Sequence, residues 1–158
     1  MSTLKVNEIQ DTSGNVRRGI QTYAIICDKK ANGADAGSIT SGAWRTRDLN
    51  TEIADPDSIV SISSNQFTLG AGSYLIEFRA PAFRVNSHTV RLYNATASAE
   101  VEVGSAAYQN IASNSQGFSE GAARVTITGD TSFEIQHRVS ITNSNTYGAG
   151  VGVAGGLN

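Results

Sequence analysis

The chain has 158 residues, a formal net charge of −2 and 39% hydrophobic residues, which suits one domain with a sizeable core. The near-neutral charge excludes a general attraction to phosphate backbones or anionic membranes, and no apolar run is long enough to span a membrane. We therefore expect no nucleic acid partner and no membrane insertion. Strong helix formers are few and scattered, while 16 glycines indicate many turns, so the composition favours an all-β fold.

Residues 1–20 differ from the rest of the chain. The opening "MSTLKVNEIQ" lacks the apolar centre of a signal peptide, which favours synthesis in a cytoplasm. Leu4 and Val6 alternate once and Ile9 falls out of step, so the segment has too little apolar surface to pack alone. We interpret residues 1–20 as an anchoring arm that docks through Leu4, Val6 and Ile9, and residues 21–158 as the domain.

Short apolar or alternating runs, separated by turn residues, fill the domain. Strands are expected at 21–27, 43–49, 57–63, 66–69, 73–83, 88–96, 99–106, 122–128, 132–141 and 147–155. No helical periodicity is present. About ten strands in one domain of this length predict two packed antiparallel sheets, in a jelly roll or similar sandwich.

The run "FTLGAGSYLIEF" (67–78) illustrates the expected design. Gly70 and Gly72 let the chain turn sharply, either between sheets or into a hairpin. The following strand then alternates, with Tyr74 and Phe78 on the core face and Leu75 on the opposite face. Farther along, the strands at 122–128 and 132–141 are expected to form a hairpin. The strand at 21–27 is expected to be largely buried.

Two glycine motifs resemble catalytic or cofactor signatures. "GFSEG" matches the nucleophile elbow of serine hydrolases at Ser119, but a polar loop precedes it and a strand follows, whereas the elbow joins a strand to a helix. The better interpretation is a flexible loop. Gly150, Gly152 and Gly155 match a dinucleotide-binding pattern, yet too few residues follow to build the required helix.

The remaining reactive side chains predict no site. His137 is in phase with apolar neighbours and is expected to be a hydrogen-bonded core or interface histidine, whereas His88 is expected to be solvated. Cys27 closes an apolar strand and is expected to be a buried, inert thiol. We therefore expect no catalytic residue, no metal and no cofactor, and hence no enzyme.

Several runs carry a resemblance to a known class of proteins. These are "NQFTLGAGSYLIEFRAPAFRVNSHTVRLYNAT", "EVEVGSAAY", "RVTITGDTSFEIQHR" and the Gly-Val-rich C-terminus. Over roughly residues 21–155 the chain resembles bacteriophage tail-fibre, head-fibre and decoration proteins with a domain similar to the tumour-necrosis-factor and complement globular-head jelly roll. The arm sequence "STLKVNEIQDTSGN" is similar to the opening of structural proteins of cyanobacterial phages.

The resemblance implies a homotrimer of jelly rolls on a virion, held to another virion protein by the arm. The chain lacks the long repetitive shaft of many tail fibres, so an accessory spike, an adaptor or a capsid-bound knob fits as well as a complete fibre. Candidates for the trimer interface are the tyrosines and the Gly-rich strand: Tyr23, Tyr108, Tyr147, Gly150 and Gly152. Loops 28–42, 112–121 and 142–147 are candidates for contact with a host-surface glycan or protein.

An alternative reading is a carbohydrate-binding module. Trp44, Tyr93 or Tyr108 would then stack on sugar rings, although core packing suits the tryptophan as well. Binding to a glycan array separates this alternative from a purely structural role.

Overall fold

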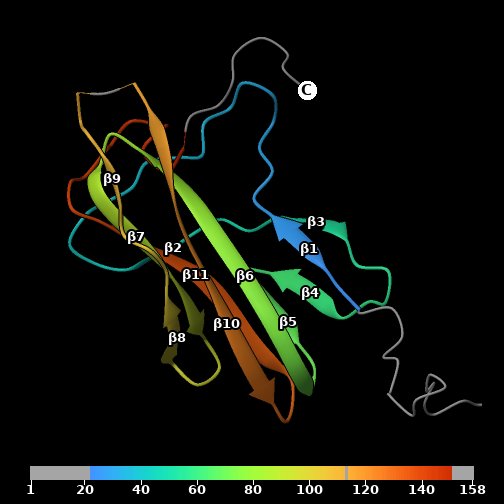
Figure 1. Ribbon diagram of the computed structural model, residues 1–158. Helices are drawn as coiled ribbons and strands as arrows, with labels where there is room; N and C mark the ends of the chain where they lie inside the picture. Colours follow the sequence, from blue (N-terminus) through green and yellow to red (C-terminus); the bar gives the residue numbers. More distant parts are fainter. Residues whose placement is uncertain (1–21, 113, 151–158) are drawn as a thin grey trace, which may run out of the picture.

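The computed structural model describes residues 22–112 and 114–150, and it confirms the expected all-β fold (Figure 1). In chain order the strands are β1 (Ile25–Cys27), β2 (Arg45–Thr46), β3 (Thr51–Ala54), β4 (Val60–Ser63), β5 (Gln66–Leu69), β6 (Gly72–Phe83), β7 (Asn86–Asn94), β8 (Ala99–Val103), β9 (Ala107–Gln109), β10 (Gln116–Ile127) and β11 (Thr131–Val139). Every strand pairing among them is antiparallel.

The strands form a sandwich of two main layers. One layer is a seven-stranded sheet in the order β4-β5-β11-β7-β8, in which β2 also pairs with β11 and β9 also pairs with β7. The other layer is the long ribbon of β6 and β10, which crosses in front of β11 and β7 in Figure 1. A small sheet of β1 and β3 lies beside the ribbon.

The core lies between the two layers and follows the alternation of the sequence. On β6 the predicted inward residue Phe78 is 7% exposed, whereas the predicted outward residue Leu75 is 71% exposed. The large sheet contributes Phe67, Phe133 and the fully buried Leu92. Apolar side chains from both layers therefore share one cluster: Phe67, Leu69, Phe78, Ala80, Val90, Leu92, Ala123, Val125 and Phe133.

Short connections carry the chain from one layer to the other. Residues 70–71 join β5 of the large sheet to β6 of the ribbon, so of the two expected alternatives the turn runs between sheets and does not form a hairpin. The expected hairpin of 122–128 with 132–141 is wrong, because β10 pairs with β6 over its whole length while β11 pairs with β5, β7 and β2. Alternation fixes the buried face of each strand but does not specify its hydrogen-bonding partner.

The N-terminal part of the domain departs from the expectation. The expected strand 21–27 is reduced to β1, and Tyr23 and Ile25 are 52% and 50% exposed, so this strand is not largely buried. The strand expected at 43–49 is only β2, and β3 and β9 are additional. Residues 146–149 form a turn where a strand was expected to begin, and residues 151–155 lie outside the described residues. The arm with Leu4, Val6 and Ile9 also lies outside them.

Two of the expected surface loops are joined into a seam. Ile39 and Asn143 form an isolated antiparallel bridge and are 5% and 6% exposed. The N–H of Gly37 donates to the carbonyl of Thr146 (2.5 Å), and the hydroxyls of Ser41 and Thr142 lie 3.0 Å apart. Parts of 28–42 and 142–147 therefore close one end of the sandwich, and their central residues are structural.

Candidate interaction surface

Ser119 is a buried structural residue. It lies within β10, with no exposed surface, so the expectation of a flexible loop around "GFSEG" is wrong. Its hydroxyl donates to the carbonyl of Ser105 (2.5 Å) and accepts from the N–H of Val90 (2.9 Å). An elbow serine is exposed at a strand-to-helix turn, whereas this hydroxyl ties the ribbon to β7.

We expect Ser119→Ala to lower the free energy of unfolding by about 1–3 kcal/mol, because the buried N–H of Val90 loses its acceptor. Urea unfolding measures the change. An exposed serine of the large sheet, Ser61 on β4, gives the matched control Ser61→Ala, which is expected to stay within about 0.5 kcal/mol of the wild type. Equal stability of the Ser119 variant and the wild type would contradict the structural role.

The two histidines form a buried pair. The expectation of a hydrogen-bonded core histidine at His137 is confirmed, but His88 is 3% exposed and not solvated. Nδ1 of His88 and Nε2 of His137 lie 3.0 Å apart. Burial, with the nearby charges of Arg47 and His88, lowers the pKa of His137 to about 3. Burial and Arg47 also lower the pKa of His88, so both rings are neutral at pH 7.

The described part of the chain holds no group of three or more His, Cys, Asp or Glu side chains placed to bind a metal ion. Cys27, at the end of β1, is half-buried and makes no disulfide. No helix within residues 22–112 and 114–150 is long and apolar enough to cross a membrane.

The aromatic candidates for sugar binding pack on an arginine of their own chain. The Arg91 guanidinium lies 4.3 Å from the ring centroid of Trp44 and 4.9 Å from that of Tyr93. Arg91 is itself held by the side-chain oxygen of Gln136 and by Glu100. One face of each ring is therefore already covered, whereas Tyr108 on β9 remains 59% exposed.

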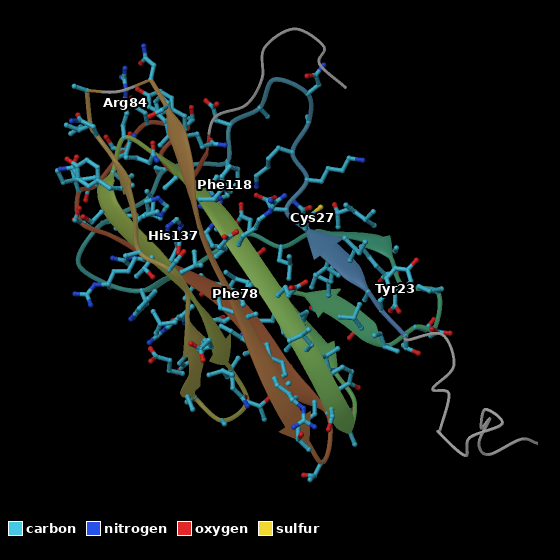
Figure 2. All side chains as sticks on the ribbon, viewed as in Figure 1. Tyr23, Cys27, Phe78, Arg84, Phe118 and His137 are labelled. Atoms are coloured by element: carbon cyan, nitrogen blue, oxygen red, sulfur yellow. The ribbon has the colours of Figure 1, made fainter. Side chains whose placement is uncertain are left out.

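The candidate trimer residues do not gather at one place. Tyr147 packs edge-on against Phe83 of its own chain, with ring centroids 5.4 Å apart. Gly150 has a φ of +145°, and a Cβ there would lie 3.1 Å from Pro81, so glycine suits the backbone itself. Tyr23 precedes β1 and lies well away from Phe118 in Figure 2, while Tyr108 belongs to the large sheet. Gly152 lies outside the described residues.

The outer face of the β6–β10 ribbon is an exposed surface that the predicted interface tyrosines did not indicate. Leu75 is 71% exposed and Phe118, at the other end of the ribbon, is 47% exposed. Figure 2 labels Phe118. Phe118 lies opposite Pro81, and Leu75 lies opposite Arg124. Leu75 already stood out in the sequence, because it is an apolar residue in phase with the charged residues of its strand.

Unpaired charges separate these apolar ends. The outer face carries two acidic and two basic side chains: Glu77, Arg79, Glu120 and Arg124. Arg79 lies opposite Glu120 but stacks over the Phe118 ring, 5.4 Å from its centroid. Among residues 22–112 and 114–150, none of the four belongs to an ion pair.

A shallow groove of about 620 Å³ crosses this face. Its lining includes Arg79, Glu120, Gly121 and Ala122. Residue 121 must be a glycine, because a Cβ at this position would lie 2.5 Å from the Phe78 ring. The result is an open surface with apolar ends, a hollow between them and balanced charge, which suits contact with another protein surface better than it suits chemistry.

Comparison with known proteins adds no identification. No protein-family model matches the chain, and no curated protein matches it.

Proposed function

We propose that this chain is a non-enzymatic structural protein of a bacteriophage particle, a jelly-roll knob that forms a homotrimer through the outer face of the β6–β10 ribbon. The arm, residues 1–20, anchors the trimer to another virion protein. The protein is made in the host cytoplasm and resides on the virion. The bacteriophage setting, the jelly-roll topology and the number three rest on the sequence resemblance.

The observation that carries the assembly part of the proposal is the composition of the ribbon's outer face. Leu75 and Phe118 are the exposed apolar side chains of this face, and both gain from being covered by a partner. The four charged side chains between them sum to zero and have no ion-pair partner within the described chain. When three copies of this face meet around a threefold axis, the neighbouring copies offer the opposite charges that each copy lacks.

The buried serine and histidines support a role without catalysis. Ser119 and the pair of His88 and His137 are enclosed between the layers, where no substrate reaches them. Their polar atoms hold strands together or bond to each other. A role in contact with a host glycan or protein remains part of the proposal for the exposed parts of the loops, and the coverage of Trp44 and Tyr93 by Arg91 gives a carbohydrate-binding module less support.

We expect the double variant Leu75→Glu/Phe118→Glu to sediment as a folded monomer at micromolar concentration, while the wild type sediments as an oligomer. New carboxylates on this face leave the core untouched but place like charges across the interface. Sedimentation velocity measures the change and circular dichroism checks folding. The matched control is Ile53→Glu on β3, which replaces a residue that is 60% exposed outside the ribbon.

The control is expected to remain an oligomer. If the double variant kept the sedimentation coefficient of the wild type, the ribbon would not be the interface. If Ile53→Glu dissociated the oligomer while the double variant did not, the small sheet of β1 and β3 would take that role instead.

A further inference from the structure

A row of polar side chains crosses the inner face of the large sheet: the half-buried Arg47 and the buried His137 and His88. The N–H of Arg47 donates to the carbonyl of Ile135 (2.8 Å), which extends the pairing of β2 with β11 by one residue. His137 lies two residues farther along β11, and His88 lies on the next strand, opposite Val139. Paired residues share a face of the sheet, so Arg47, His137 and His88 all point toward the second layer.

Three nitrogen atoms in this row are buried without a hydrogen-bond partner among the described residues. They are Nη1 of Arg47, Nδ1 of His137 and Nε2 of His88. Buried polar atoms in folded proteins are nearly always satisfied by protein, ordered water or an ion. An unsatisfied cluster of this kind therefore points to a bound species from solvent.

The positive charge of Arg47 favours an anion as the bound species. The Arg47 guanidinium stays protonated, and its Nη2 donates only to a neutral group, the carbonyl of Ala149 (2.8 Å). The acidic side chains whose charge acts on it, Asp28 and Asp48, are instead bonded to Lys30 at 3.1 and 2.6 Å. A buried cation beside two neutral imidazoles has no direct counter-ion in the described chain, and that is costly.

The hydrogen bond between the histidines supplies a second donor. The roles of the two nitrogens depend on the tautomer, and binding of an anion beside His137 requires the one in which Nδ1 of His88 donates to Nε2 of His137, so that the neutral His137 carries its own proton on Nδ1. That N–H and Nη1 of Arg47 are then two donors on neighbouring strands without acceptors. His137 has no exposed surface, so the species that accepts from them is small.

We propose that Arg47 and His137 bind a small halide-type anion, chloride in ordinary solution, between the two layers of the sandwich. The anion accepts hydrogen bonds from Nη1 of Arg47 and Nδ1 of His137 and supplies the missing counter-charge. It holds β2 against β11 at the place where Arg47 also holds the carbonyl of Ala149. The site is independent of the oligomer interface, because it lies on the opposite side of the ribbon from Leu75.

Urea unfolding in sodium chloride and in sodium gluconate, at equal ionic strength and pH 7.5, tests the proposal. We expect the unfolding midpoint to be higher in chloride, since gluconate is too large for an enclosed site. Once chloride exceeds its dissociation constant, the ratio of folded to unfolded protein should rise close to tenfold per tenfold increase in chloride. Arg47→Met should abolish this difference, while Arg138→Met, at an exposed arginine of β11 on the other face of the sheet from His137, should retain it.

Crystals of the wild-type protein grown in sodium bromide give a second readout that does not depend on a variant. We expect an anomalous bromide peak in contact with Nη1 of Arg47 and the His137 ring. Equal unfolding midpoints in the two salts would overturn the proposal. So would a water molecule in place of bromide, or a chloride effect that survives in Arg47→Met.

Discussion

Phe133→Ala is expected to lower the free energy of unfolding by about 3–5 kcal/mol, the range typical of removing a buried phenylalanine side chain. Phe133 is 1% exposed and lies near the middle of the large sheet, where β11 pairs with β5 on one side and β7 on the other. Its ring stacks on Phe67, with centroids 5.6 Å apart. The cavity left by the ring would lie between the two layers, and rigid neighbouring strands limit how far it can close.

Denaturant unfolding at fixed protein concentration measures this loss, because oligomers gain stability with concentration. Ile53→Ala is the control, since it removes a large side chain that is 60% exposed. We expect the control to change stability by no more than about 0.5 kcal/mol. A loss below about 1 kcal/mol for Phe133→Ala would mean that this side chain is not at the centre of the core.

Acid should destabilise the protein through its two histidines. Burial first, and then the charges of Arg47 and His88, lower the pKa of His137 to about 3, and His88 shifts in the same direction. In the unfolded chain a histidine has a pKa near 6.5. As the pH falls below about 6.5, the histidines of the unfolded state therefore bind protons while those of the folded state stay neutral. The contribution of the histidines to the free energy of unfolding is thus complete above about pH 6.5 and is lost as the pH falls toward the folded pKa.

The expected loss from His137 alone is about 3 kcal/mol between pH 7 and pH 4, at about 1.4 kcal/mol per unit of pKa shift. Urea unfolding across this pH range in sodium gluconate measures it, because a chloride bound beside His137 would raise its pKa. Because the chain has only these two histidines, the variant His88→Gln/His137→Gln removes the whole effect while keeping side chains that form hydrogen bonds. A steep loss between pH 6.5 and 4.5 that persists in the double variant would contradict the assignment, as would a wild type equally stable at pH 7 and pH 4.5.

Much of the strand pattern could be predicted from the sequence, because alternation reports directly on burial. The inward set on β6 and the buried Val90 and Leu92 on β7 follow this rule. On β8, Val103 does not, since it is 40% exposed although its sequence pattern matches that of the half-buried Val101. On a short strand at the edge of a sheet, neighbouring elements cover one valine and leave the next in solvent. Only the positions of those neighbouring elements decide which valine is covered.

The missed features depend on partners that are distant in sequence. Gly117 and Gly121 made the start of β10 look like a loop, but the Phe78 ring occupies the space beside Gly121, so glycine is needed inside a strand. His88 looked solvated because it was placed at a strand end, whereas β7 begins two residues earlier and His137 meets it across the sheet. The seam between Ile39 and Asn143 joins residues more than a hundred positions apart, which no local pattern reveals.

The candidate surface illustrates the same limit. The sequence predicted that Leu75 faces away from the core, and the structure bears this out. It did not predict that Phe118 lies on the same face, because that requires the register of β10 on β6. The tyrosines were predicted to lie at a trimer interface only because aromatic side chains suit such contacts, yet they lie on different elements of the fold.

Native mass spectrometry of the full chain at low micromolar concentration tests the central claim most directly. The proposal predicts a species with three times the mass of the chain, and conversion of that species to monomer by Leu75→Glu/Phe118→Glu. A wild-type chain that is folded and monomeric under these conditions, with residues 1–20 intact, would contradict assembly through the β6–β10 face.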